Sequence, residues 1–434
     1  MNRNCIRRVL AGVALVAGVA QGQAPAGYYD TVDGSSAGAL RASLHDIIDD
    51  HTKIPYTDSV LLDTWQVLGE AQENPNNATQ ILDIYRNSSF IKFTGGNPFY
   101  NREHSWPSSY GFPVDGPDNY PYSDCHALFL CDDGYNTSRS NKPFRNCSQF
   151  CQEFTTDVND GQGGGSGVYP GNSNWTTGSF SSGTWEVWSG RRGDIARAIF
   201  YMDVRYEGGA HGITGFPEPN LIVTDNSSLI TTTGGSNASV AYMGIRSVLL
   251  EWHEQDPVDD FERNRNDVVF NAQGNRNPFV DHPEWVDCIF GGNCCTTGLP
   301  DAPNLCSDVN SLSMSSGGVQ TMTLFPGVAF GGDFYWMLGS VSGTSPGIDI
   351  AGVNVPLNFD PYTSLTLSMP LLPGVFMGFL NVFDPEGLAT ASFSVGPGQD
   401  PGLAGTILYH AYVTTEDFVV VDFASDPVPL LLVP

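Results

Sequence analysis

The stretch of sequence around which the chain is organised reads Tyr100-Asn101-Arg102-Glu103-His104-Ser105-Trp106-Pro107. After a loop of 16 residues comes Asp124-Cys125-His126, and ten residues later comes Asn136-Thr137-Ser138-Arg139-Ser140-Asn141. We expect Glu103 and His104 to lie on a strand and Asn136 on a short helix that Pro143 ends. These three side chains supply a proton acceptor, an anionic oxygen ligand and a neutral oxygen ligand.

This combination suits phosphodiester hydrolysis, which needs an activated water, neutralisation of developing charge and help for the departing 3′-oxygen. His104 can take the water's proton because an ordinary imidazole titrates near neutral pH. Glu103 and Asn136 each offer an oxygen to one hard divalent cation, for which we expect Mg²⁺, with Ca²⁺ or Mn²⁺ as alternatives. Consecutive strand side chains diverge, so Glu103 and His104 can flank one phosphate.

Other polar residues of the stretch have predicted roles around these three. Arg139 follows Asn136 by three residues and shares its helical face, so we predict a catalytic contact from two guanidinium donors to a phosphate oxygen. Asp124 and His126 are expected to join helix and strand through hydrogen bonds, with a direct catalytic role as the alternative. Two roles stay open for Asn141: it either caps the helix or joins a buried network, or it contacts the surroundings of the metal.

The blocks resemble the bacterial endonuclease I family of secreted or periplasmic nucleases, which have the ββα-metal (His-Me finger) active site. The similarity spans roughly residues 27–295 and rests on several blocks in order: Glu103-His104-x-Trp106-Pro107, Asp124-x-His126-x-Leu128, Asn136-x-x-Arg139-x-Asn141-x-x-Phe144, Arg192-Gly193-Asp194-Ile195-Ala196-Arg197-Ala198 with Tyr201-Met202, and Gln273-Gly274-Asn275-Arg276-Asn277-Pro278-Phe279.

The resemblance implies His104 as general base, a metal bound by Glu103 and Asn136, and cleavage of DNA, commonly also RNA, with little sequence preference and 5′-phosphate ends. Some relatives carry a phosphate-contacting arginine in the loop before the Asp-x-His block, but residues 108–123 contain no Lys or Arg. Arg102, Arg139 or Arg197 would have to take that role. Arg276 is a further candidate for nucleic-acid contact, with bracing of a turn as the alternative.

The fold class expected is α+β, with a ββα-metal nuclease domain with added helices over 27–295 and an all-β sandwich over 311–434. The 12 acidic residues beyond residue 296 are accompanied by no Lys or Arg, and the intervening 296–310 reads as a linker. In the C-terminal part, runs that alternate at period two are separated by Gly and Pro about every ten residues, as in antiparallel sandwiches.

Upstream, the spacing of apolar residues predicts helices over 36–51 and 58–71 and a further helix from Asp194. The second helix is expected to bury Leu61, Leu62, Trp65 and Leu68. Short strands are expected over 81–85 and 90–93. The Gly-, Ser- and Asn-rich residues 155–184 are expected to form a long surface loop.

The N-terminus indicates export. Three arginines precede an apolar run, Val9 to Ala20, which is followed by small residues, so residues 1–26 read as a signal peptide and no membrane span is expected. We therefore expect a secreted or extracellular protein, with the periplasm as the alternative, and a monomer. Eight cysteines remain, and we expect disulfides that brace the catalytic stretch through the Cys125/Cys131 and Cys147/Cys151 spacings.

The net charge of −28 opposes nucleic-acid binding, because phosphate binders usually carry a basic face. One alternative is therefore a catalytically inactive extracellular surface or matrix protein built on a nuclease-like domain, and another is a hydrolase of a different phosphodiester. The first is favoured if the basic side chains do not converge around His104, namely Arg102, Arg139, Lys142, Arg145, Arg191, Arg192, Arg197 and Arg276.

Overall fold

The computed structural model describes residues 24–292, 294–295, 299, 302–350, 352–416, 418 and 420–434. The predicted signal peptide, 1–26, lies outside the described residues except for its last three positions, and the linker predicted over 296–310 is described only in part. Within the described ranges, no helix has the length and apolar character needed to cross a membrane.

A β-hairpin followed directly by a helix carries the catalytic stretch. β4 (Tyr100–His104) pairs antiparallel with β5 (Leu128–Asp132), so that Glu103 lies opposite Phe129 and His104 opposite Leu128. α3 (Asp133–Arg139) begins at once because the Asp132 carboxylate accepts hydrogen bonds from the backbone N–H groups of Gly134 and Tyr135. The four apolar residues Leu128 to Cys131 are buried and anchor the hairpin to the core.

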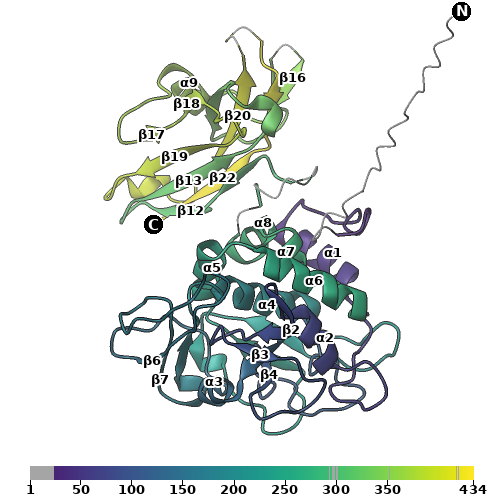
Figure 1. Cartoon of the computed structure of the whole chain (residues 1–434). Coiled ribbons are helices and arrows are strands. Elements are labelled where there is room, and N and C mark those ends of the chain that lie inside the picture. Colours follow the sequence, from purple (N-terminus) through teal and green to yellow (C-terminus); the bar gives the residue numbers. More distant parts are fainter. Residues whose placement is uncertain are drawn as a thin grey trace, which may run out of the picture.

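Helices cover this region on one side (Figure 1). α4 (Arg192–Arg205) is central and is buried along all 14 of its residues. The others are α1 (Ala37–Ile48), α5 (Arg246–Gln255), α6 (Asp260–Gln273), α7 (Pro278–Asp281), α8 (Glu284–Val286) and a π-helical turn, Asp287–Gly291. The helix predicted over 36–51 is confirmed as α1, and the helix expected at Asp194 as α4.

The predicted helix over 58–71 is only partly correct, since α2 spans Thr64–Ala71. The Asp58 carboxylate accepts hydrogen bonds from the N–H groups of Val60 and Leu61 and so holds that segment in a turn. Asp63 then caps α2 in a capping box with Gln66. Leu61 and Leu62 precede the helix and remain 60% and 49% exposed.

Three small sheets complete the nuclease-like part. They are β1 (Glu73–Asn74) with β2 (Asn77–Leu82) and β3 (Ser89–Ile91); β6 (Gln152–Phe154) with β7 (Asn174–Thr177) and β8 (Thr184–Glu186); and the parallel pair β9 (Asn220–Val223) and β10 (Val240–Met243). The long loop expected over 155–184 was therefore wrong in its last part. The first three residues of β7 are buried there, and the Asn174 side chain donates to the Tyr85 carbonyl.

The C-terminal part is built from two sheets that share one hydrophobic core. One has the order β11-β13-β19-β17, from β11 (Leu305–Ser307), β13 (Gly318–Leu324), β19 (Ala389–Val395) and β17 (Phe376–Met377). The other has the order β12-β22-β20-β14-β18, from β12 (Ser311–Ser313), β22 (Val428–Val433), β20 (Ile407–Thr415), β14 (Phe334–Ser340) and β18 (Leu380–Val382). Met322 and Phe393 of the first sheet join Tyr335 and Tyr412 of the second in this core.

Smaller elements border these sheets. β21 (Phe423–Ala424) pairs with β20, and β15 (Ile348–Ile350) forms a hairpin with β16 (Val353–Val355). α9 (Pro361–Ser368), which the sequence analysis did not anticipate, is capped by Asp360.

Three disulfides join Cys147 to Cys151, Cys288 to Cys294 and Cys295 to Cys306. The expected bridge at Cys147/Cys151 is confirmed, whereas the one at Cys125/Cys131 was wrong, since both are buried free thiols. The two side chains pack in different hydrophobic clusters, Cys131 of β5 with Phe129, and Cys125, in the turn before β5, with Leu128. The two sulfurs are therefore buried apart from each other.

A buried histidine gives the C-terminal core a pH dependence. The His410 side chain packs in this core, where its Nε2 lies 2.7 Å from the Tyr362 hydroxyl and its Nδ1 3.2 Å from the Gln320 side-chain oxygen. Burial lowers the pKa of His410 to about 3. The folded chain therefore keeps this imidazole neutral, whereas the unfolded chain protonates it below its ordinary pKa.

We predict that the free energy of unfolding falls as the pH drops from about 6.5 toward 4, by about 1.4 kcal/mol per pH unit from His410 alone. The sign follows because the unfolded state binds more protons in this range. Chemical unfolding of wild type and His410→Gln across this range measures it, and the variant should show a shallower slope. Equal slopes would contradict the assignment.

Candidate active site

His104 lies at the end of β4 in a fixed orientation. Its Nε2 is 2.8 Å from the carbonyl oxygen of Tyr122, and its ring packs against Tyr56 at 5.8 Å and an interplanar angle of 19°. Burial lowers the pKa of His104 to about 4, so the ring is neutral at neutral pH. A neutral ring that donates from Nε2 to a carbonyl carries its lone pair on Nδ1, which is then the atom able to accept a proton.

Glu103 points to the opposite side of β4 and is 2% exposed. The Tyr85 hydroxyl donates to its Oε1 at 3.0 Å, and Nη1 of Arg139 approaches the same oxygen at 2.9 Å. Its Oε2 has no hydrogen-bond partner among the described residues. Burial raises the pKa of Glu103 to about 7, although Arg139 and Tyr85 act in the opposite direction. A second cation next to Oε2 would favour the ionised form.

Asn136 projects from α3 toward the same strand. Its Nδ2 donates to the backbone carbonyl of Arg102 at 3.3 Å, and its Oδ1 has no partner among the described residues. The structure therefore places Asn136 against the backbone of the residue before Glu103, and each of the two side chains has one uncommitted oxygen. Two hard oxygen donors suit Mg²⁺ or another hard divalent cation that keeps several water ligands. Across the described ranges, no cluster of three or more His, Cys, Asp or Glu side chains could form a protein-rich metal cage.

Arg139 was predicted to hold a phosphate, but the structure places it in the interior. The residue is 0% exposed, and it donates to the carbonyl oxygens of His104 at 2.8 Å and Ser105 at 2.6 Å in addition to its ion pair with Glu103. Both terminal nitrogens are thus used within the protein. Arg139 therefore holds the end of β4 and the Glu103 carboxylate in place and acts as a positioning residue.

The part of the chain that carries this site matches known proteins. A family model described as Endonuclease I matches residues 36–284. An extracellular ribonuclease of Bacillus subtilis is 36% identical over 266 residues, which cover 61% of this chain and 78% of the relative. An extracellular ribonuclease of Bacillus amyloliquefaciens is also 36% identical, over 267 residues with the same coverage.

The chain belongs to the endonuclease I family. Membership makes it a nuclease, an enzyme that hydrolyses phosphodiester bonds of nucleic acid.

In this endonuclease, Asp124 and His126 lie behind the hairpin and are buried. Asp124 accepts hydrogen bonds from the hydroxyls of Tyr201 and Tyr206, both at 2.9 Å, and from the Gln273 side chain at 3.1 Å. His126 has its Nε2 3.0 Å from the Asn275 carbonyl. These bonds join the start of β5 to α4 and to the end of α6, which agrees with the structural role favoured for both residues.

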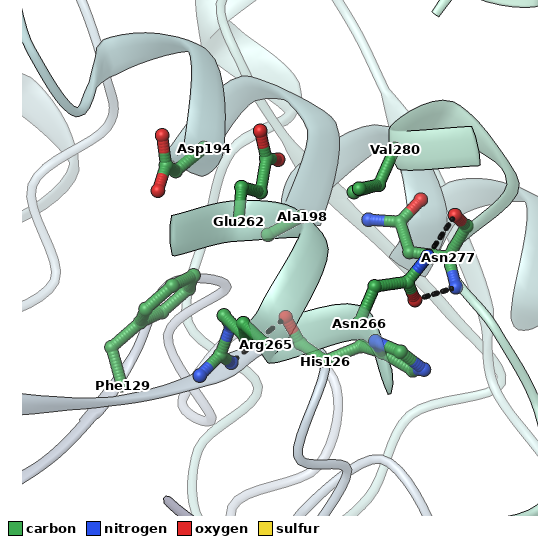
Figure 2. A pocket seen from close by; sticks show the side chains of 9 residues that line it. All are labelled: His126, Phe129, Asp194, Ala198, Glu262, Arg265, Asn266, Asn277 and Val280. Carbon is green, nitrogen blue, oxygen red and sulfur yellow. Dashed lines mark hydrogen bonds between the residues drawn. The ribbon is translucent and has the colours of Figure 1, made fainter. Parts of the chain in front are cut away.

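Arg265 of α6 is a supporting residue that the sequence analysis missed. Its Nη2 donates to the carbonyl oxygens of Cys125 and Leu128, the latter at 2.5 Å, and its guanidinium lies 3.9 Å over the Phe129 ring. Figure 2 shows Arg265 beside Phe129 and the backbone of His126. Phe129 pairs with Glu103, so Arg265 holds the strand opposite the site. The only sequence signal was an arginine on a charged helix, which does not identify its partners.

The small cavity shown in Figure 2 has a volume of about 10 Å³ and is lined by Asp194, Glu262 and Arg265 together with neighbouring residues. A cavity of this size holds at most one water-sized group. It belongs to the buried support of the hairpin and is too small for a nucleotide.

Arg197 and Arg276, expected at the nucleic-acid surface, are 0% and 1% exposed. Arg197 pairs with Glu262 at 2.6 Å, and Arg276 pairs with Asp281 at 2.6 Å and with Asp267 at 2.8 Å. Their donors are directed to carboxylates inside the protein, so we assign both to bracing. For Asn141 the role was left open. Its Nδ2 donates to the Ser109 hydroxyl at 3.4 Å, and its backbone carbonyl accepts from the Tyr110 hydroxyl, which supports the buried-network interpretation.

Arg102 lies on β4 itself, two residues before His104, and is partly exposed. Its guanidinium lies between the Tyr56 ring at 3.4 Å and the Trp65 ring at 4.3 Å, and Nη1 donates to the Thr64 hydroxyl at 2.9 Å. Of the eight basic residues expected to converge on His104 in a DNA-capturing enzyme, only Arg102 and Arg139 contact the catalytic strand in the contacts described. The others bond elsewhere, so the described contacts do not show the convergence on His104 by which DNA capture was to be judged: Lys142, Arg145, Arg191, Arg192, Arg197 and Arg276.

We predict that Arg139→Met lowers the free energy of unfolding by about 3–5 kcal/mol, because it leaves the Glu103 carboxylate buried without its cation. Arg263→Met is the matched control, since the ion pair of Arg263 with Asp260 is exposed and should cost less than about 1 kcal/mol. Denaturant unfolding of both variants tests this difference. A stable Arg139→Met protein would show that the buried pair is dispensable.

Proposed function

We propose that the protein is a secreted, one-metal endonuclease in which β4, β5 and α3 form a ββα-metal site. The single observation that carries this proposal is that one hairpin and the helix that follows it present three atoms of matched chemistry without partners. They are Nδ1 of His104, Oε2 of Glu103 and Oδ1 of Asn136, and none has a partner among the described residues.

In this mechanism, Nδ1 of His104 accepts the proton of a water that attacks the phosphorus atom. The Tyr122 carbonyl holds the ring in the tautomer that leaves Nδ1 free, and the low pKa keeps the ring neutral before the reaction. Arg139 and Tyr85 hold Glu103 so that Oε2 faces away from them. Glu103 and Asn136 would hold a divalent cation, which supplies charge neutralisation for the phosphate oxygens and the departing oxygen.

The bond that forms joins the water oxygen to phosphorus, and the bond that breaks is the one to the 3′-oxygen. The water's proton passes to His104, and the 3′-oxygen leaves with the bonding electron pair and takes a proton from solvent. The products are a 5′-phosphate and a 3′-hydroxyl. We propose both RNA and DNA as substrates. The extracellular ribonucleases that match this chain support RNA, and the described site has no feature that reads a base pair through the grooves of a duplex.

Secretion is part of the proposal. The relatives that match are extracellular by name, and three disulfides in the structure suit an oxidising compartment. The C-terminal two-sheet part, which we propose to be a β-sandwich, presents no Lys or Arg and is not needed for the chemistry described.

We predict that His104→Ala lowers kcat by about 10²–10⁴-fold, the usual worth of a general base, with KM little changed. The control is His282→Ala, since that imidazole stacks on Trp285 away from β4 and is 37% exposed. Cleavage of a labelled RNA and of plasmid DNA, each at saturating Mg²⁺, provides the rates. Undiminished cutting by His104→Ala would refute the mechanism.

We predict that EDTA abolishes cleavage and that Asn136→Ala raises the Mg²⁺ concentration for half-maximal activity by about tenfold or more, as expected for loss of a ligand. Asn101→Ala removes an exposed carboxamide from the same strand and serves as the control. A Mg²⁺ titration of activity, together with calorimetric Mg²⁺ binding, measures the change. Identical Mg²⁺ dependences of the two variants would remove Asn136 from the site.

A further inference from the structure

A cleft of about 450 Å³ opens next to the catalytic strand and is not used by the mechanism above. Its walls come from two segments that are distant in the sequence, 53–57 and 115–117, and its lining residues are Lys53, Pro55, Tyr56, Thr57, Asp115 and Gly116 with Pro117. The volume lies in the range of small-ligand sites, about 300–1,000 Å³.

Tyr56 connects this cleft to His104. Its ring packs against the His104 ring at 5.8 Å and against Tyr122 at 4.8 Å, and its carbonyl accepts a hydrogen bond from Arg102. The Arg102 guanidinium lies 3.4 Å from the centre of the Tyr56 ring and covers one face of it. Tyr56 can therefore meet the cleft only through its other face or its edge. The stack of Trp65, Arg102 and Tyr56 makes the ring a rigid platform.

Lys53 supplies a cation on the wall of the same cleft. The chain has three lysines, of which Lys92 pairs with Glu73 and Lys142 donates to Ser138 and Thr176. Lys53 makes no hydrogen bond or ion pair with any residue that the structure describes. Burial lowers the pKa of Lys53, while the carboxylates of Asp115 and Asp118 act to raise it. Its ammonium group is thus partly desolvated and uncommitted.

We propose that this cleft is a nucleotide subsite, which rests on the proposed function: it binds the nucleotide next to the scissile phosphate in a single strand. The Lys53 ammonium contacts a phosphate of that strand, and the Tyr56 ring stacks on a base. Asp115 repels phosphate, so the strand's backbone lies on the Lys53 side, while base amino groups can donate to the carboxylate. The missing cation of the 108–123 loop is then supplied from residue 53.

This geometry selects substrates whose bases can leave the stack. A base can enter the cleft only after it is unstacked, which costs a few kcal/mol in a duplex and far less in a single strand. Several basic side chains that could attract a duplex over a longer range are bonded inside the protein, as described above for Arg197 and Arg276. Single-stranded RNA or DNA is therefore the preferred substrate class.

The decisive experiment compares Lys53→Gln with Lys92→Gln, which removes the same charge from a site away from the cleft. The full chain is assayed with Mg²⁺ on a labelled 12-nucleotide single strand and on the duplex of the same sequence. We expect wild type to cleave the single strand at least tenfold faster in kcat/KM. Lys53→Gln should lose about fivefold to tenfold on the single strand, mostly in KM, and Lys92→Gln less than twofold.

Two further measurements separate a phosphate contact from a general loss of structure. Lys53→Arg should restore most of the single-strand KM. Binding of the 12-mer in EDTA, followed by fluorescence anisotropy, should lose about 0.7 from the slope of log affinity against log salt in Lys53→Gln, the value for one phosphate contact to a single strand. In the same binding assay, Tyr56→Leu should bind about tenfold more weakly and Tyr56→Phe as wild type.

The outcomes distinguish the two proposals. If wild type cleaves both substrates equally and the two glutamine variants behave alike, the subsite is overturned while the nuclease mechanism stands. The subsite is also overturned if Lys53→Arg is as impaired as Lys53→Gln. If wild type cleaves neither substrate, the proposed function itself fails.

Discussion

Glu103 is held in the interior by its ion pair with Arg139, whose nitrogen lies 2.9 Å from Oε1. Burial alone would favour the neutral carboxyl group, and the arginine offsets part of that cost. Because Arg139 also donates to the His104 and Ser105 carbonyls, one side chain fixes both the carboxylate and the backbone that carries the base. Every role proposed for β4 depends on this pair, which leaves Oε2 rather than Oε1 for a cation.

The support extends from this pair into a buried polar core. Asp124 receives donors from α4 and α6, Arg265 binds three carbonyls at the start of β5, and Arg197 pairs with Glu262 inside the same region. Charged groups without water are costly unless they are paired and hydrogen-bonded, so this network contributes position more than stability. A site built on such a core keeps its geometry before substrate arrives, which is what a preorganised catalyst requires.

The distribution of charge then limits how substrate is recognised. A chain with 47 acidic and 19 basic residues cannot attract a polyanion over long distances. Several of its arginines also form ion pairs inside the protein. Recognition must therefore be local. In our proposal it falls to a divalent cation, to Lys53 and to aromatic surfaces such as Tyr56, which act over a few ångströms. Contacts of this kind suit a flexible single strand more than a rigid duplex.

The sequence by itself determined the local features. The Glu103-His104 pair, the helix-borne Asn136, the helix over 37–48 and the break in composition near residue 296 follow from patterns that span a few residues. Only the tertiary structure decided which side chains pair with one another. Arg197 pairs with Glu262, 65 positions away, and Asp124 with Tyr201, 77 positions away, and Cys125 and Cys131 are buried in different hydrophobic clusters. Local sequence sets backbone conformation, but the burial and the partners of a charged side chain depend on long-range packing. The burial of Arg139 and the position of Lys53 could therefore not be predicted.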